Sequence, residues 1–434
     1  MKSNPRFVLA YSGGLDTSVI LNWLRERYGA EVVTVTADFG QKKELNGIRE
    51  RAIAGGATRV YVDDVREEFV RDYVWPSLKA GALYQGVYPL ATALGRPLIA
   101  KRLVLAARET GADAIVHGCT GKGNDQVRIE VSVGALAPDL RCIAPLREWE
   151  LKSRDDEIAW AKERGIPVVA TSNSPYSLDE NLWGTSIEGG AMEDPWAAPP
   201  AGAWQMTTDP IDAPDQPADV TIAFECGVPV SLDGREHGGP DLIDALNRLG
   251  AMHGVGRIDV VEDRLVGIKS RELYEAPAAV ILHAARASLE QITLDRETRR
   301  LKEQMGQELA RLIYDGLWYS PLRRSIQAFV DEATARVTGE VRLSLGKGAV
   351  RTLGRRSPVS LYRYGLATYG KGDGFHHAAS AGFIEIFGLA ARTASAVAED
   401  VPVTVTDGAS PGEAVLVAGD VPAPGENGGH GGGR

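Results

Sequence analysis

Cysteine is scarce in this chain of 434 residues, and the three cysteines, Cys119, Cys142 and Cys226, lie far apart. They form neither a CxxC pair nor the spacing of a zinc site, and their odd number argues against a disulfide framework. The sequence therefore excludes a cysteine-rich secreted scaffold and a structural zinc module. A reducing compartment fits this usage of cysteine best.

Long apolar runs are also missing. No segment approaches the ~20 consecutive apolar residues that a membrane-spanning helix needs. The first residues, MKSNPRFVLAYSGG, lack the apolar core of a signal peptide. We therefore expect a soluble, cytoplasmic protein with no membrane partner.

The chain has no surplus of positive charge. Lys and Arg number 48 against 58 Asp and Glu, so the formal net charge is −10. Such a chain lacks the basic surface that attracts a nucleic-acid backbone, and we expect no nucleic-acid partner. Hydrophobic residues make up 44% of the sequence, which is enough for a real core. The length predicts more than one domain.

Residues 1–171 alternate between two kinds of segment and are predicted to form one domain. Strand-like segments occupy residues 7–11, 32–39, 59–62, 114–117, 142–145 and 168–170. Helix-like segments occupy residues 16–28, 48–54, 97–110 and 155–164, with Pro97 placed at a helix start. This alternation predicts the α/β class, with a doubly wound, mostly parallel sheet. Ligands of such sheets bind at the carboxyl ends of the strands.

The pattern changes after residue 171, and residues 172–375 are predicted to form a second domain of α+β type. Gly, Pro, Asp and Trp crowd residues 184–217, which indicates a long irregular connection. Beyond it we expect two strands, two helices and a hairpin, at residues 219–230, 258–268, 276–289, 297–314 and 337–353. A C-terminal helix is expected within residues 376–400, packing on another subunit, and the tail of residues 401–434 is expected to be disordered.

The first glycine turn is the most informative local feature. It runs Ala10-Tyr11-Ser12-Gly13-Gly14-Leu15-Asp16-Thr17-Ser18, after a strand and into a helix. Such a turn presents free backbone N–H groups and the positive end of a helix dipole to an anion. The glycines allow close approach to phosphate oxygens, and the hydroxyls add donors. The turn is neither a Walker A motif nor a dinucleotide fingerprint. The alternative is an ordinary strand–turn–helix in which Ser and Asp only cap the helix.

The string SGGLDTS resembles the pyrophosphatase loop of the N-type ATP-pyrophosphatase family, whose members cleave ATP between the α- and β-phosphates. The resemblance implies an adenine nucleotide alpha hydrolase-like fold in which residues 10–18 bind ATP and hold the leaving pyrophosphate. It makes residues 1–171 the nucleotide-binding domain and places Ala37 on the adenine side. Without the resemblance, Ala37 is better explained as a small residue at a strand end. Asp16 is expected to organise the loop or a Mg²⁺ ion, with helix capping as the alternative, and no metal ligand is assigned.

A second loop, HGCTGKGNDQ at residues 117–126, follows the strand-like AIV and leads to Arg128. With Arg128 it is similar to the argininosuccinate synthase family. Further motifs of that family follow in order: YSLDENLW at 176–183, HGVGRID at 253–259, VEDR at 261–264, KSRELYE at 269–275 and GLWYSP at 316–321. The resemblance extends to about residue 390.

This resemblance implies a ligase of arginine biosynthesis. It would join citrulline to aspartate and split ATP into AMP and pyrophosphate through a citrullyl-adenylate. Family members are usually tetramers, so a homotetramer is expected. The substrates implied are citrulline, aspartate and ATP, with Mg²⁺ on the phosphates.

The resemblance also assigns individual residues. It gives Gly118 a contact with the nucleotide, and it gives aspartate the residues Thr120, Asn124 and Asp125. Asp125 would orient the amine of aspartate as a catalytic residue, beside Asp16. Citrulline would be bound by Tyr88, Asn124, Arg128, Ser177, Ser186, Glu262 and Tyr274. The guanidinium of Arg128 suits a carboxylate, and Glu262 can pair with an ammonium group. Alternatively, Tyr88 and Tyr274 are half-buried packing residues and Glu262 is the polar tip of a turn.

Two departures from the family pattern affect the predicted citrulline site. Ala93 stands where some relatives have a serine that contacts citrulline, and Thr92 is the candidate replacement. Residues 276–279 (APAA) replace a Thr-Pro-Gly-Gly-like stretch next to Tyr274.

Other functions remain open from the sequence. A tRNA-thiolating relative should show paired reactive cysteines and basic surfaces, and a glutamine-using ligase should carry a glutaminase domain. Neither feature is visible. A non-catalytic nucleotide-binding or regulatory protein is the rival from a different class.

Overall fold

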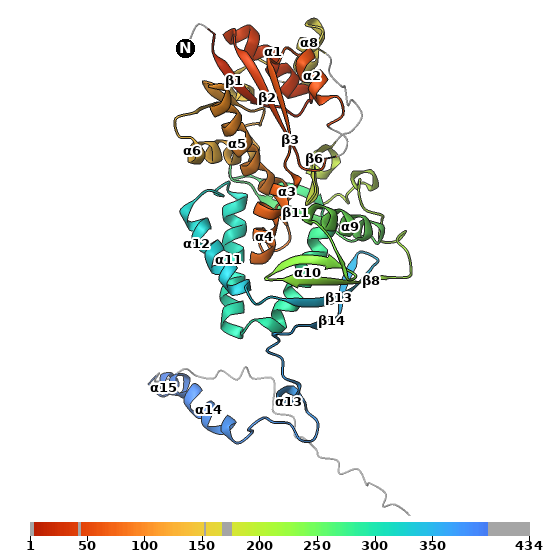
Figure 1. The fold of residues 1–434 in the computed structure, drawn as a ribbon, viewed down its shortest axis with the longest axis vertical. Coiled ribbons are helices and arrows are strands. Elements are labelled where there is room, and N and C mark those ends of the chain that lie inside the picture. The colour runs from red at the N-terminus through yellow and green to blue at the C-terminus, as the bar shows by residue number, and fades with distance from the viewer. Residues whose placement is uncertain (1–3, 42–44, 152, 167–175, 398–434) are drawn as a thin grey trace, which may run out of the picture. The chain divides into compact units, whose positions relative to one another are not determined.

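The computed structural model describes residues 4–41, 45–151, 153–166 and 176–397. The chain divides into two compact units after Tyr362. Figure 1 shows the course of the chain through both units. The strand predicted at residues 168–170 and the tail predicted to be disordered lie outside the described residues.

The N-terminal part is built on a five-stranded parallel sheet of order β3-β2-β1-β4-β5. Its strands are β1 (Arg6–Ala10), β2 (Glu31–Asp38), β3 (Arg59–Asp64), β4 (Ala114–Val116) and β5 (Arg141–Ile143). Helices alternate with them along the chain: α1 (Leu15–Tyr28), α2 (Ile48–Ala54), α5 (Ala91–Thr110), α6 (Asp125–Leu136), α7 (Pro145–Glu148) and α8 (Arg154–Glu163). The α/β class with a parallel sheet is confirmed.

Helices cover both faces of this sheet because successive side chains of a strand point to opposite faces. Phe7 and Leu9 of β1 pack in one core with residues of α1, α2 and α8. Val8 packs in another core with residues of α5 and α6. The sheet is therefore doubly wound, as the alternation of segments predicted.

Helix α5 begins six residues earlier than predicted. It starts at Ala91, and Pro97 lies inside it rather than at its first turn. A proline inside a helix removes one backbone hydrogen bond, which is why the sequence pattern favoured a start at Pro97. The earlier start has a consequence for the site, because it puts Thr92 and Arg96 one turn apart on the same face of the helix.

The connection from β3 to α5 is largely helical. Helix α3 (Arg66–Phe69), a π-helical segment η1 (Val70–Val74) and helix α4 (Trp75–Ala80) follow one another without a gap. None of these three elements was predicted from the sequence.

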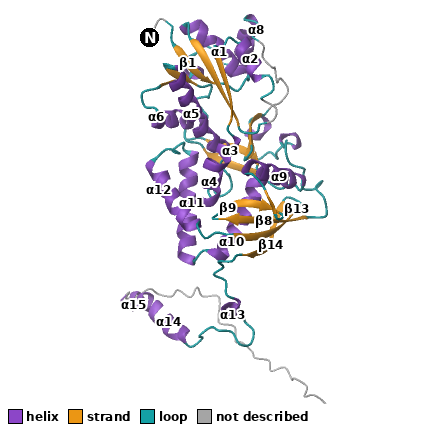
Figure 2. Cartoon of the chain, in the orientation of Figure 1, coloured by secondary structure: helices purple, strands orange, loops and turns teal. Residues whose placement is uncertain are grey.

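Two antiparallel sheets form the second part, which agrees with the predicted α+β type (Figure 2). One has the order β10-β9-β8-β13-β14, from β8 (Ala218–Glu225), β9 (Val228–Leu232), β10 (Arg235–Glu236), β13 (Gly339–Gly346) and β14 (Ala349–Arg356). The other has the order β11-β12-β7-β6, from β6 (Ser177–Asn181), β7 (Gly184–Glu188), β11 (Arg257–Asp263) and β12 (Lys269–Glu275). The helices are α9 (Gly239–Met252), α10 (Pro277–Thr293), α11 (Arg296–Tyr314) and α12 (Pro321–Thr334), with short 3-10 turns η2 (Gly190–Glu193) and η3 (Ala201–Ala203).

Several predicted elements of this part were wrong in detail. The strand predicted at residues 219–230 is two strands, β8 and β9, joined by a turn in which Cys226 and Gly227 both have positive φ. The strand predicted at 258–268 ends at Asp263. The connection predicted to be irregular from residue 184 opens with strand β7, which pairs with β6 and β12.

The second unit, taken by itself, holds the short helix α13 (Tyr364–Ala367) and the helices α14 (Ala379–Phe387) and α15 (Leu389–Val397). The single C-terminal helix that the sequence predicted is therefore two helices, separated at Gly388. Neither α14 nor α15 has a buried residue. No helix in the described part of the chain is both long and apolar enough to span a membrane.

Candidate functional site

A cavity of about 480 Å³ lies at the carboxyl ends of strands β1, β2 and β4. Ala10, Ala37 and Gly118, which lie at or just beyond these strand ends, line one side of it. The β11-β12-β7-β6 sheet lines the other side, with Ser186 and Tyr274 among its residues. The location follows from the fold, since ligands of open parallel sheets bind at the carboxyl ends of the strands.

Most of the predicted site residues meet in this cavity. They are Ala10, Tyr11, Ser12, Thr17, Ala37, Tyr88, Gly118, Thr120, Asn124, Asp125, Arg128, Ser177, Ser186, Glu262 and Tyr274. Gly14, Leu15 and Asp16 line an adjoining cavity of about 1180 Å³, which shares Ser12, Thr17 and Gly118 with the first. Gly13 and Ser18 line neither cavity.

The glycine turn has the geometry of an anion-binding loop. Gly13 has a φ of 75°, in the left-handed region that favours glycine. Gly14 is the N-cap of α1, and no side chain caps the helix. The expected alternative, that Asp16 caps α1, is therefore wrong, because Asp16 lies in the first turn. The hydroxyls of Ser12 and Thr17 lie 3.2 Å apart beside the turn.

Asp16 lies next to a second acidic side chain. Glu157 of helix α8 faces it, and burial, followed by the nearby charge of Asp16, raises the pKa of Glu157 to about 8. The side chain of Glu157 therefore carries a proton at neutral pH, next to the loop that the sequence predicts to hold pyrophosphate.

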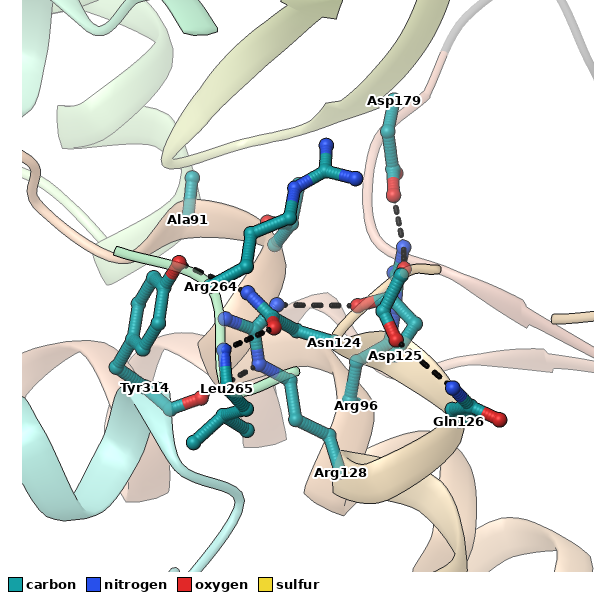
Figure 3. A network of polar contacts seen from close by, with 12 residues as sticks. Ala91, Arg96, Asn124, Asp125, Gln126, Arg128, Asp179, Arg264, Leu265 and Tyr314 are labelled. Atoms are coloured by element: carbon teal, nitrogen blue, oxygen red, sulfur yellow. Dashed lines mark hydrogen bonds and ion pairs between the residues drawn. The ribbon is translucent and has the colours of Figure 1, made fainter. Parts of the chain in front are cut away.

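An ion network occupies the wall beside the second loop (Figure 3). One guanidinium nitrogen of Arg96, Nη2, is 2.7 Å from Asp125 Oδ2 and also pairs with Asp179. Nη1 of Arg128 lies 3.1 Å from the other oxygen of Asp125. Burial alone would raise the pKa of Asp125, but Arg96 and Arg128 outweigh it and hold that pKa at about 2. Asp125 is therefore a carboxylate across the physiological range.

A cluster of tyrosines surrounds Glu262. This glutamate belongs to strand β11, is 3% exposed, and accepts hydrogen bonds from the hydroxyls of Tyr274 and Tyr314. Burial raises its pKa, and these two hydrogen bonds oppose the rise. The alternative that Glu262 is the exposed tip of a turn is wrong. The rings of Tyr88 and Tyr274 stack with centroids 3.9 Å apart, and both tyrosines are buried while also lining the cavity.

The two departures from the family pattern have structural correlates. Ala93 is buried and does not line the cavity, whereas Thr92 does, and its hydroxyl lies 2.7 Å from that of Tyr88. Thr92 thus supplies a hydroxyl at this position of the wall. The second departure forms the start of helix α10, where Ala276, Ala278 and Ala279 are buried in the core.

The amide of Asn124 is held at both ends. Its Oδ1 accepts a hydrogen bond of 2.9 Å from the backbone N–H of Leu265, and its Nδ2 donates one of 2.8 Å to the hydroxyl of Tyr314. One hydrogen of the Nδ2 group remains for a ligand.

Sequence reasoning missed several polar residues of the wall. Arg264 bridges Glu188 and Glu272, all three line the cavity, and burial together with Glu188 raises the pKa of Glu272. Arg96 and Asp179 were missed as well. Three of them could have been found from the sequence, because Asp179, Arg264 and Glu272 fall inside the family motifs YSLDENLW, VEDR and KSRELYE. Arg96 had none, because helix α5 was expected to start after it.

Known proteins resemble the chain along most of its length. Residues 6–167 match the family model described as "Arginosuccinate synthase N-terminal HUP domain", and residues 176–394 match "Arginosuccinate synthase C-terminal domain". The argininosuccinate synthase of Pelodictyon phaeoclathratiforme is 55% identical over 395 residues, covering 91% of this chain and 99% of that protein. The one from Chlorobaculum tepidum is 56% identical over 392 residues, covering 90% and 98%.

The fold, the family models and the relatives define the class of this protein: it is an ATP-using ligase built on a HUP domain. Within that class the identity and coverage decide the family. The chain belongs to the argininosuccinate synthase family.

Proposed function

We propose that this chain joins citrulline to aspartate in the cytoplasm and that residues of the described cavity carry out the reaction. One observation carries the proposal. Ser12 and Thr17, which flank the glycine turn suited to phosphate, line the same cavity as an ionised Asp125, a buried Arg128 and the buried carboxylate of Glu262. These groups are complementary to the three reactants: the turn to the pyrophosphate leaving group, Asp125 to the amine of aspartate, and Arg128 with Glu262 to the amino-acid group of citrulline.

The reaction has two steps. The ureido oxygen of citrulline attacks the α-phosphorus of ATP, forming a new P–O bond and releasing pyrophosphate. The amine of aspartate then attacks the activated ureido carbon, and AMP leaves with the oxygen to give argininosuccinate. Neither step needs an acid–base dyad, so the contribution of the protein is to orient the reactants and stabilise charge.

The nucleotide is assigned to residues at the carboxyl end of the parallel sheet. Residues 10–18 take the pyrophosphate portion, with the uncapped N-terminus of α1 as the anion-binding element. Gly118 contacts the nucleotide where the two cavities meet, and Ala37 lies on the adenine side.

The amino-acid substrates are assigned to residues of α6, of the loop before it and of the β11-β12-β7-β6 sheet, together with Tyr88. Arg128 binds the carboxylate of citrulline and Glu262 its ammonium group, with Asn124, Tyr88, Tyr274, Ser177 and Ser186 supplying the neutral contacts. Asp125, held as a carboxylate, orients the amine of aspartate, which Thr120 and Asn124 also contact. The opposite charges of Arg128 and Glu262 fix the direction in which an amino acid can lie.

Magnesium fits this site as a partner of the phosphates. Mg²⁺ usually binds proteins through one or two carboxylates and keeps substrate phosphate oxygens and water as its other ligands. Asp16 provides such a carboxylate beside the glycine turn. The described residues contain no group of three or more His, Cys, Asp or Glu that would hold a metal by itself. When bound, the ion would neutralise phosphate charge.

A homotetramer assembled through the C-terminal helices is the second part of the proposal. Helices α14 and α15 have only nine residues each and no buried side chain, and short isolated helices are marginal in water. Their exposed apolar residues include Phe383, Ile384, Ile386, Phe387 and Leu389. An apolar surface of this kind supports association with another subunit.

The experiment that tests the reaction measures AMP and pyrophosphate release from ATP. Release that needs both citrulline and aspartate supports the proposal. Formation of ADP and orthophosphate would contradict it, and so would release that ignores citrulline, as expected for a thiolating enzyme. A regulatory nucleotide-binding protein would give no release at all.

A further inference from the structure

Tyr314 lies behind the cavity wall and contacts three of the residues assigned to citrulline. It is the last residue of helix α11 and is fully buried. Its hydroxyl accepts a hydrogen bond of 2.8 Å from Asn124 Nδ2 and donates one of 2.7 Å to Glu262 Oε2. Its backbone carbonyl accepts a hydrogen bond of 2.9 Å from Arg128 Nε. Figure 3 shows Tyr314 beside Asn124 and Arg128.

Two neighbours pack on the ring of Tyr314. The ring of Tyr84 stacks on it with centroids 3.6 Å apart and planes 4° from parallel, and the guanidinium carbon of Arg128 lies 4.8 Å from its centroid. The chain turns at Gly316, where φ is 79° and a Cβ would lie 2.7 Å from the Cα of Arg128. Only glycine allows this close approach, which brings the end of α11 against α6.

The hydrogen bonds around the Tyr314 hydroxyl leave a single arrangement. A phenol has one hydrogen to donate, and the carboxylate of Glu262 can only accept it. The oxygen is then free to accept from Asn124, whose Oδ1 already accepts from the N–H of Leu265. The orientation of the Asn124 amide and of one oxygen of Glu262 therefore depends on this hydroxyl.

We propose that Tyr314 is a positioning residue that sets the amide of Asn124, the carboxylate of Glu262 and the guanidinium of Arg128 for the amino-acid substrate. The inference rests on the proposed function, in which these three groups bind citrulline. Tyr314 itself lines neither cavity and touches no reactant.

The acid limb of the pH profile provides a readout that a purely structural role would not change. The groups that face Glu262, besides Tyr314, are Tyr84, Tyr88, Arg128, Arg264, Glu272 and Tyr274. All of them stay in place when only the Tyr314 hydroxyl is removed. Loss of that hydrogen bond to the ionised form raises the pKa of Glu262 further. Binding of an ammonium group then fails at a higher pH than in the wild type.

The test compares Tyr314→Phe with Tyr73→Phe. Tyr73 is equally buried, stacks on Trp318, and its hydroxyl lies 3.1 Å from that of Tyr319, away from the cavity. We expect Tyr314→Phe to raise the KM for citrulline about tenfold, as loss of one hydrogen bond to a charged group implies, with kcat changed less. Its acid limb should move to higher pH. Tyr73→Phe should change thermal stability only.

A second replacement keeps the size of the ring. With 3-fluorotyrosine at position 314 the phenol is a stronger donor, so the acid limb should move to lower pH. The inference would be overturned, and the proposed function left intact, if Tyr314→Phe and the 3-fluorotyrosine protein both kept the wild-type KM for citrulline and the wild-type pH profile, with only Tm lowered as in Tyr73→Phe. Absence of citrulline-dependent AMP release by the wild-type chain would instead overturn the proposed function, and the inference with it.

Discussion

Asp125 and Arg96 form an ion pair of 2.7 Å that joins helix α6 to helix α5 in the wall of the cavity. The side chain of Arg96 is 14% exposed and also pairs with Asp179 of strand β6. The guanidinium of Arg96 therefore links helices α5 and α6 of the N-terminal part to strand β6 of the second part. Removing Arg96 leaves Asp125 with Arg128 as its one remaining cation and takes from Asp179 the cation with which it pairs. Losing a partner from such a partly buried network costs more than losing an exposed pair does.

Arg96→Gln should lower the free energy of unfolding by about 3 kcal/mol and reduce AMP formation, because Asp125 loses one of its two cations. Arg108→Gln on the same helix is the matched control. Arg108 pairs with Asp139 on the exposed surface, where an ion pair contributes little to the free energy of unfolding. Urea denaturation measures both variants. Equal losses in the two would contradict the structural role given to Arg96.

Gly13→Val should abolish turnover and leave a folded protein. Valine must adopt a φ of 75° there, and its Cβ would lie 2.9 Å from Arg51 Nη2 and 3.2 Å from Ile48 Cγ1. The turn would then lose its close approach to phosphate oxygens. The rate of citrulline-dependent pyrophosphate release reports the effect.

The control for this change is Gly29→Val at the other end of helix α1. Gly29 has a φ of 60°, but nothing lies within 4 Å of a Cβ built on it. The two substitutions share a backbone strain of about 1–2 kcal/mol and differ in what surrounds them. Near-normal turnover by Gly13→Val would defeat the assignment of the pyrophosphate site.

The parallel sheet was predictable because its signals are local. Short β-branched strands such as residues 32–39 alternate with helical segments, and the glycine turn after residue 10 marks the strand end where ligands bind. Much of the cavity was predictable for a different reason, since its residues fall inside recognisable motifs. Burial of Glu262 under two tyrosine hydroxyls was not predictable, because Tyr314 is 52 residues away in the sequence.

The errors share a physical cause, which is tertiary packing that overrides local preference. Pro97 is a poor residue for a helix interior, yet α5 continues through it because the turns on both sides are buried. Ala93 and Leu94 pack in the core shared with the second part, and Ala100 and Leu103 pack against the parallel sheet. Strand β7 is bounded by glycines and would be marginal alone, but it is central in its sheet and pairs on both sides. Its partner β6 directly precedes it in the sequence, but its other partner, β12, begins only at Lys269.

Stability should depend on pH through Glu157. Its pKa is about 8 in the folded chain against 4.5 for an ordinary glutamate, so the folded state binds the proton more tightly. The protonated Glu157 contributes fully to stability below pH 4.5, the ordinary pKa of a glutamate. This contribution is lost as the pH rises through about 8. Glu157→Gln keeps a neutral side chain at every pH. Its free energy of unfolding should therefore rise relative to that of the wild type as the pH rises through this window.

Urea titrations at a series of pH values test this dependence. Glu163→Gln serves as the control, because Glu163 lies on the same helix with its side chain 75% exposed. Wild-type and Glu157→Gln curves that stay parallel across the window would show that Glu157 is not a protonated partner of Asp16. In that case Asp16 would face no neutralised neighbour at the pyrophosphate loop.

Ile386→Glu should dissociate the proposed tetramer. Ile386 is 76% exposed on helix α14, which has no buried residue. A charge placed in a desolvated contact between subunits has no compensation, so association weakens. Ile211→Glu is the matched control, since this isoleucine is 81% exposed in the first unit. Sedimentation velocity should give a tetramer for the wild type and for Ile211→Glu, and smaller species for Ile386→Glu. A wild-type chain that sediments as a monomer, or an Ile386→Glu variant that remains tetrameric, would remove the role given to this helix.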